Sequence, residues 1–146
     1  MEDQDFMSVA IALAKSGVEK GLGGPFGAVV VKDGVIIGRG QNRVLADADP
    51  TAHAEVVAIR DACAHLGSFQ LDGCTLYTSC EPCPMCAMAA VWAGVSKIYF
   101  GATIDDAAAH GHQVKIYCRE IAEKAWYDIK VEGGVLQDDC VALFHK

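Results

Sequence analysis

The sequence predicts an α/β fold in which helices cover both faces of a mixed β-sheet. Two observations predict it. The stretch "FGAVVVKDGVIIGRG" at 26–40 is two Val/Ile-rich runs joined by Asp33-Gly34, which is the pattern of an antiparallel hairpin. From residue 74 onward, short apolar runs alternate with helical patterns, as they do in parallel βα units. A hairpin that continues into βα units gives a sheet with both strand orientations.

The elements of the first half follow in order. Residues 5 to 20 carry apolar side chains at helical spacing, and "GLGG" at 21–24 ends that helix with residues that tolerate positive φ. After the hairpin, the turn-rich segment 41–51 is expected to be a loop. A second helix is expected from Thr51, a candidate N-cap, to about residue 65.

The second half continues the alternation. "CPMCAMAAVWAG" at 83–94 has the small apolar residues of a packed helix, and we expect short buried strands on either side of it, at 74–79 and 97–102. A helix over 113–125, a strand and turn over 127–134 and a closing helix over 135–146 complete the expectation.

Composition restricts the class of protein. A chain of 146 residues, about half of them apolar, is expected to form a single domain over residues 1–146. An acidic start and the lack of a long apolar run predict a cytoplasmic protein without membrane segments. The net charge of −7 makes a nucleic-acid partner unlikely without excluding it. Seven cysteines, an odd number, favour thiols or metal ligands over a disulfide framework.

Two short stretches carry the chemistry. Cys83 and Cys86 are three residues apart beside Pro84, so a helix that begins there directs both sulfurs to one side of its first turn. His53 lies at the expected start of the preceding helix. If the two helices pack side by side, one nitrogen and two sulfurs meet and leave a fourth position open, as in catalytic zinc sites. Glu55 lies two residues beyond His53 and is placed to carry protons to and from a water at that position.

Other interpretations compete with the catalytic zinc. Cys80, Cys83 and Cys86 also spell C-x2-C-x2-C, as in ferredoxins, but Ala90 stands where the fourth cysteine of that pattern belongs. A redox CxxC pair is a second alternative, although it does not require His53 and Glu55. A structural zinc that recruits Cys80 as its fourth ligand is a third. We favour the catalytic zinc because H-x-E and P-C-x-x-C form a joint signature.

The motifs resemble those of a known enzyme superfamily. "HAE" at 53–55 with "PCPMC" at 82–86 is similar to the zinc-dependent cytidine/deoxycytidylate deaminases. Within that superfamily, "GGPFGAVVVKDG" at 23–34, "DPTAHAEVVAIRDAC" at 49–63 and "LYTSCEPCPMCAMAA" at 76–90 resemble bacterial guanine deaminases most closely. The tRNA adenosine deaminases and fungal cytosine deaminases are more distantly similar.

The resemblance implies a three-layer α/β/α sandwich with a central five-stranded sheet, a homodimer, and hydrolytic release of ammonia from an amino-substituted nucleobase or nucleoside. A guanine-type purine is the expected substrate. Zinc is expected on His53, Cys83 and Cys86, with Glu55 as the catalytic residue. Substrate contacts are expected from Asn42, from the backbone N–H groups of Ala54 and Cys83, and from the rings of Phe26 and Trp92.

Several of these residues have plainer interpretations. Asn42 suits a turn. Phe26 is about as well explained by core packing, and Trp92 by a dimer contact. His110 and His112 could line the pocket, although an exposed pair is favoured.

The chain departs from the guanine deaminases after Gly111. It carries His112-Gln113-Val114-Lys115 where they carry an acidic pair, and its last residues are more similar to those of tRNA adenosine or cytosine deaminases. Another amino-purine, a pterin, a triazine, cytosine and adenosine in tRNA therefore stay open as substrates. A zinc-binding module without activity also stays open, as does completion of a neighbouring subunit's pocket by the C-terminal segment.

Overall fold

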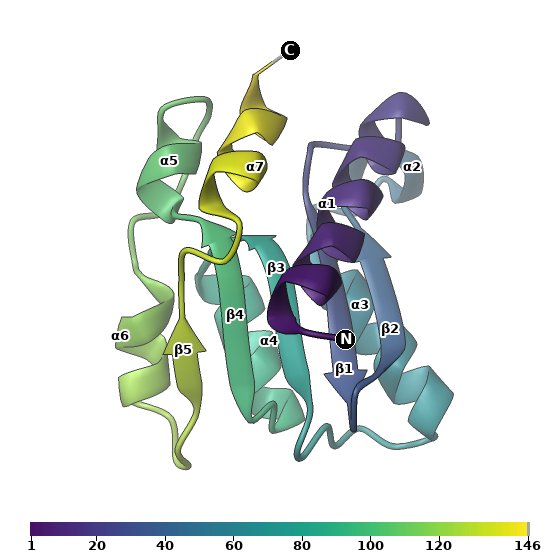
Figure 1. Ribbon diagram of the computed structural model, residues 1–146, viewed down its shortest axis with the longest axis vertical. Helices are drawn as coiled ribbons and strands as arrows, with labels where there is room; N and C mark the ends of the chain where they lie inside the picture. The colour runs from purple at the N-terminus through teal and green to yellow at the C-terminus, as the bar shows by residue number, and fades with distance from the viewer. Residues whose placement is uncertain (146) are drawn as a thin grey trace.

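The computed structural model describes residues 1–145 of the chain and has a five-stranded sheet as its central layer (Figure 1). The strand order is β2-β1-β3-β4-β5. The β1 strand pairs antiparallel with β2 and β3, whereas β3 with β4 and β4 with β5 are parallel. The expected mixed sheet is confirmed. The strands are β1 (Gly27–Lys32), β2 (Val35–Gln41), β3 (Thr75–Cys80), β4 (Lys97–Ala102) and β5 (Lys130–Glu132).

The β1–β2 hairpin turns at the dipeptide that predicted it. Asp33 has φ 49° and Gly34 has φ 75°. Two successive left-handed residues match the right-handed twist of the strands they join, and Asp-Gly is among the dipeptides that adopt this conformation at lowest cost.

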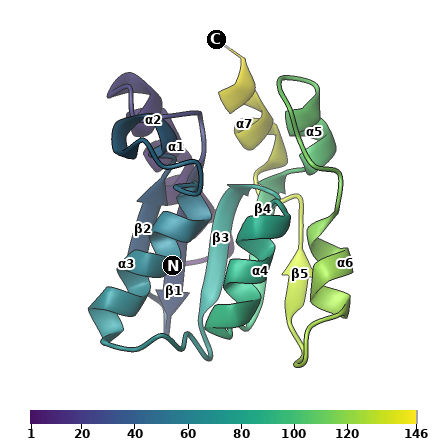
Figure 2. The ribbon, with the colours of Figure 1, turned by 180° about the vertical axis from the view of Figure 1, so that it is seen from behind.

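Helices cover both faces of the sheet. Helix α1 (Asp3–Glu19) packs on one face together with α7 (Gln137–Val141), and Figure 1 shows α1 in front of the sheet. Figure 2 shows α3 (Ala54–Leu66) and α4 (Pro84–Ala93) on the opposite face. Side chains of β1 alternate between the two cores, as strand geometry requires. The resulting three layers confirm the α/β/α sandwich.

Helix α3 packs closely on β2 because the strand carries Gly38 and Gly40 beneath it. A Cβ atom built on Gly40 would lie 2.1 Å from the carbonyl oxygen of Ala54 and 2.5 Å from the nitrogen of Ala58. Ala54 and Ala58 are themselves fully buried. This small-residue contact seats the first turn of α3 directly on the sheet.

Three expectations in the first half and at the end of the chain need correction. The loop at 41–51 contains a short helix, α2 (Val44–Asp47). Helix α3 has His53 as its N-cap residue and not Thr51, because the Thr51 hydroxyl donates to the side chain of Asp49, 2.7 Å away, within the preceding turn. The closing helix is limited to α7 and a 3-10 turn (Ala142–Phe144), while Lys146 lies outside the described residues.

The segment after β4 differs from the expectation as well. Helix α5 (Ile104–Ala108) was not expected, and the helix expected over 113–125 is present only as α6 (Cys118–Glu123). Residues 112–117 have no regular secondary structure. Among the helices described here, none combines the length and apolar composition that a membrane span requires.

Candidate metal centre and active site

Three predicted ligands meet at the first turns of α3 and α4. His53 is the N-cap residue of α3 and Cys83 is the N-cap residue of α4, whose first residue is Pro84. The sulfur atoms of Cys83 and Cys86 are 3.7 Å apart. The Nδ1 atom of His53 lies 3.6 Å from the Cys83 sulfur and 3.5 Å from the Cys86 sulfur. The structure thus brings together one nitrogen and two sulfurs from segments thirty residues apart in sequence.

These distances fit a zinc ion. With ordinary bond lengths of ~2.3 Å to sulfur and ~2.0–2.1 Å to nitrogen, a tetrahedral ion requires its ligands to be about 3.8 Å apart for sulfur with sulfur and about 3.6 Å for sulfur with nitrogen. The observed separations match all three edges. One imidazole and two thiols also form a donor set that binds zinc in preference to magnesium or calcium, which favour oxygen ligands.

The two cysteine ligands differ in pKa, and Cys83 is the one held in the form that binds metal. The hydrogen bond between the two sulfur atoms, assisted by His53, lowers the pKa of Cys83 to about 4. The same hydrogen bond, together with burial, raises the pKa of Cys86. A thiolate is therefore present at neutral pH, and thiolates are the form in which cysteine ligates metals.

Cys80 does not join the three ligands. Its sulfur lies 3.8 Å from the carbonyl oxygen of Thr103, and the residues whose ligand atoms lie within 4.8 Å of one another are His53, Cys83 and Cys86. Burial raises the pKa of the Cys80 thiol well above its usual range. The arrangement therefore offers three protein ligands and not the closed set of four typical of structural zinc.

The metal residues lie on the wall of a cavity of about 630 Å³. Small-molecule sites usually enclose roughly 300–1,000 Å³, so the cavity is large enough for a nucleobase. Its lining includes the predicted residues Phe26, Asn42, His53, Glu55 and Cys83 and, in addition, Pro50, Cys80, Glu81, Pro84, Met85, His112, Gln113, Val114 and Ile116.

Glu55 is the buried acid of this cavity. It belongs to the first turn of α3 and is only 6% exposed. Burial, which penalises the charged form, raises the pKa of its carboxyl to about 7, and the neighbouring Cys83 thiolate acts in the same direction. A carboxyl that titrates near neutrality can both accept and donate a proton.

Asn42 and Phe26 lie on another part of the wall. Asn42 is 8% exposed, and its Oδ1 atom accepts a hydrogen bond from the Val44 N–H at 2.9 Å, so the turn interpretation describes part of what it does. The Phe26 ring also contacts Phe144 near the C-terminus, with centroids 5.9 Å apart. The C-terminal segment thus contacts Phe26, a residue that lines the cavity of the same chain.

Of Trp92, His110 and His112, which the sequence offered as possible pocket residues, His112 alone lines the cavity. Trp92 is absent from the cavity lining, is 70% exposed, and packs against Trp126 with ring centroids 5.3 Å apart. It lies near the end of α4, two turns beyond the metal ligands, which explains why it does not reach the site. His112 lies at the cavity, whereas His110 packs on Phe144. Both histidines are exposed.

Sequence reasoning named His112 as a possible pocket residue but missed Gln113, Val114, Ile116 and the buried acid Glu81. The loop residues form no motif that could have predicted their place at the cavity. Glu81 did carry a signal, since it is a charged residue inside the apolar and cysteine-rich stretch 79–86.

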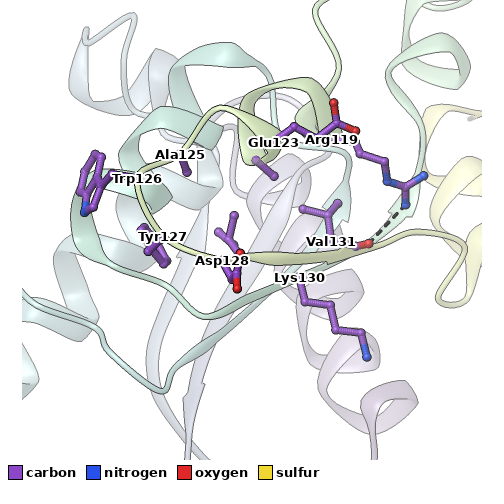
Figure 3. A pocket seen from close by; sticks show the side chains of 10 residues that line it. Arg119, Glu123, Ala125, Trp126, Tyr127, Asp128, Lys130 and Val131 are labelled. Atoms are coloured by element: carbon purple, nitrogen blue, oxygen red, sulfur yellow. Dashed lines mark hydrogen bonds between the residues drawn. The ribbon is translucent and has the colours of Figure 1, made fainter.

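A second cavity, of about 550 Å³, lies between α6 and β5 (Figure 3). It contains none of the predicted residues. Its lining is tied together by Arg119, whose guanidinium donates to the Val131 carbonyl oxygen at 3.2 Å, and Trp126 lies at one end. It offers no cluster of metal ligands comparable to that of the first cavity.

Comparison with known proteins agrees with this geometry. The family model of the cytidine and deoxycytidylate deaminase zinc-binding region matches residues 1–102. The chain is 53% identical over 125 residues to a guanine deaminase of Bacillus subtilis, covering 86% of this chain and 80% of that protein. It is 39% identical over 139 residues to a tRNA-specific adenosine deaminase of the same species, covering 95% and 84%.

Solved structures show the same relationship. The crystal structure of the Bacillus subtilis guanine deaminase is 51% identical, with a TM-score of 0.77 over 88% of this chain and 84% of that chain. The structure of a guanine deaminase from Nitrosomonas europaea is 32% identical, with a TM-score of 0.88 over 97% and 81%. The chain belongs to the cytidine and deoxycytidylate deaminase family and is a zinc-dependent hydrolytic deaminase.

Proposed function

We propose that this protein deaminates guanine, consuming one water and releasing xanthine and ammonia. The observation that carries the proposal is the similarity to guanine deaminase over most of both chains, combined with a cavity that joins the metal ligands to a buried acid. The net charge of −7 favours a small substrate over a polyanion.

The residues divide the work as follows. His53, Cys83 and Cys86 would hold the zinc ion, which would supply a Lewis acid that lowers the pKa of water and makes a nucleophile available at neutral pH. Glu55 accepts the proton of the attacking water, transfers it to the ring nitrogen beside the amine-bearing carbon, and then protonates the departing amine. Its burial and its raised pKa support both directions of transfer.

The substrate is held flat against the remaining wall. Phe26 stacks on the base, and the amide of Asn42 contacts its polar edge. The N–H of Ala54, in the first helical turn where backbone donors have no partner within the helix, polarises the attacked group, as does the N–H of Cys83. Gln113 belongs to the stretch 112–115, which replaces the acidic pair that the resemblance to guanine deaminases leads us to expect, and its side chain offers the substrate both a donor and an acceptor.

An ammonia-release screen tests the substrate. Purified protein with one zinc per chain is supplied with guanine, adenine, cytosine, their nucleosides, a pterin and a triazine. Guanine should give the highest kcat/KM. A tRNA anticodon stem-loop is included because the similarity to tRNA-specific adenosine deaminase covers nearly the whole chain. Inosine formation in that stem-loop, without guanine turnover, would replace the proposal with the second candidate.

We further propose that the protein acts as a cytoplasmic homodimer. Seven free cysteines, one of them a thiolate, suit a reducing compartment. Trp92 and Trp126 are 70% and 66% exposed and lie side by side, next to a shallow groove lined by Met88 and Ile116 among others. An apolar surface of this kind marks a contact site. Because Ile116 also lines the cavity that contains the metal residues, a second copy bound at the groove would support the wall of that cavity.

A further inference from the structure

Glu81 is a buried carboxylate to which the proposed mechanism gives no part. It lies in the turn between β3 and α4, two residues before the ligand Cys83, and only 7% of it is exposed. It borders the cavity that contains the metal residues, together with Glu55. Burying a carboxylate is costly unless it accepts hydrogen bonds, so the partners of this one define its purpose.

Both oxygens of Glu81 are occupied by backbone donors. Oε1 accepts the Ile104 N–H at 3.0 Å, and Oε2 accepts the Cys118 N–H at 3.0 Å. Ile104 and Cys118 are the first residues of α5 and α6, and both are fully buried. One side chain therefore holds the beginnings of two helices, whose first residues are fourteen positions apart in sequence.

The segment between these two anchors forms a wall of the cavity. The cavity lining includes His112, Gln113, Val114 and Ile116 as well as the metal ligands His53 and Cys83, and residues 112–117 lack regular secondary structure. The Ile116 N–H donates to the Val114 carbonyl oxygen at 2.9 Å, but this hydrogen bond stays within the stretch and does not fix its distance from the metal residues. The Tyr117 hydroxyl adds one link, donating to Asp105 at 2.8 Å, but that link stays within the segment. Glu81 ties the segment to the metal-binding turn.

We propose that Glu81 is a positioning residue that fixes the wall at 112–116 relative to the metal centre and thereby sets the affinity for the substrate. Two N–H groups converge on it, so the role requires two acceptor atoms on one side chain. A carboxylate supplies both, whereas a glutamine supplies one acceptor and turns an NH₂ group toward the other N–H. Glu81 itself transfers no proton and touches no substrate.

The kinetic part of this inference rests on the proposed function, because it is measured with guanine. The structural part does not. Amide hydrogen exchange reports local opening of a segment whether or not the enzyme turns over, and zinc content reports the metal centre separately.

The test compares Glu81→Gln with Glu120→Gln in the zinc-loaded protein. Glu120 is the matched control, since its Oε1 accepts the Tyr117 N–H at 3.2 Å in the exposed first turn of the same helix α6 but makes no link to the metal-binding turn. In Glu81→Gln, exchange of the segment 104–118 should accelerate by about tenfold or more. KM for guanine should rise about tenfold while kcat changes by less than about threefold, the pattern of lost uniform binding. Zinc should stay at one per chain, and Glu120→Gln should change neither KM nor exchange at Ile104.

Three outcomes overturn the proposal: unchanged exchange over 104–118, a fall in kcat at constant KM, or loss of zinc. The last two would make Glu81 a catalytic or metal-site residue. If Glu81→Gln does not fold, Glu81→Asp replaces it, because it keeps the charge but is too short to reach both N–H groups and should give the same pattern. If wild-type protein does not deaminate guanine, the proposed function fails, and the exchange measurement still decides whether Glu81 holds the wall.

Discussion

Adding a single methyl group beneath α3, by Gly40→Ala, should disturb the metal centre without touching any of its residues. The new Cβ would lie 2.1 Å from the Ala54 carbonyl oxygen, whereas real Cβ contacts essentially never fall below 3.0 Å. This oxygen and the Ala58 nitrogen, 2.5 Å from the new Cβ, are backbone atoms, so no side chain can rotate away to relieve the contact. The start of α3 must retreat from the sheet by about 1 Å, and it carries His53 and Glu55 with it.

The expected cost has two parts. Overpacking of this size usually lowers the free energy of unfolding by about 1–3 kcal/mol. The displacement also separates His53 from Cys83 and Cys86, whose positions depend on α4. A shift of about 1 Å at a reacting group can lower kcat/KM by about 10²-fold, and zinc affinity should fall by about 10- to 100-fold, as it does when the support of a ligand is lost.

Gly27→Ala provides the matched control. Its Cβ would lie 2.0 Å from the Ala10 carbonyl oxygen, beneath α1 on the opposite face of the sheet. Urea denaturation, competition with a zinc chelator and ammonia release are measured on both variants. Both should lose stability, but only Gly40→Ala should lose zinc affinity out of proportion. If the two variants bind zinc equally well, close seating of α3 on β2 does not position the ligands and the reasoning is refuted.

Three further outcomes are expected. Glu55→Gln should keep one zinc per chain by elemental analysis but lose about 10²–10⁴-fold in kcat, and near-normal ammonia release would remove Glu55 from the mechanism. Trp92→Glu should convert a dimer into monomers in sedimentation velocity, because it places a charge beside Trp126; an unchanged sedimentation coefficient would place the contact elsewhere. Asp106→Asn should lower stability at pH 7 by less than about 1 kcal/mol, since the carboxylate is largely solvated. Hydrogen bonds, chiefly from the Thr103 N–H, hold the pKa of Asp106 below its usual 3.8, so its contribution is complete above that value and disappears as the pH falls below it; an equal difference at pH 7 and pH 2 in denaturation experiments would contradict this.

Local pattern alone determined much of this protein. Asp33-Gly34 specifies its own left-handed turn, and the alternation from 74 onward specifies the βα units, because both depend on neighbours in sequence. The metal ligands could also be predicted from the sequence. Cys83 and Cys86 share a first turn by helical spacing, and the pairing of H-x-E with P-C-x-x-C leaves few other uses for His53.

Tertiary structure decided what depends on segments distant in sequence. Nothing near Trp92 says that the end of α4 points away from the cavity, because its direction follows from packing against the sheet. The wall at 112–116 has no periodicity to read, and its position comes from hydrogen bonds to Glu81, which lies more than twenty residues earlier in the chain. The sequence thus determined which residues could hold zinc, while the folded chain alone determined what faces it across the cavity. The physical reason is that ligand spacing is a local property, whereas a cavity is enclosed by contacts between distant segments.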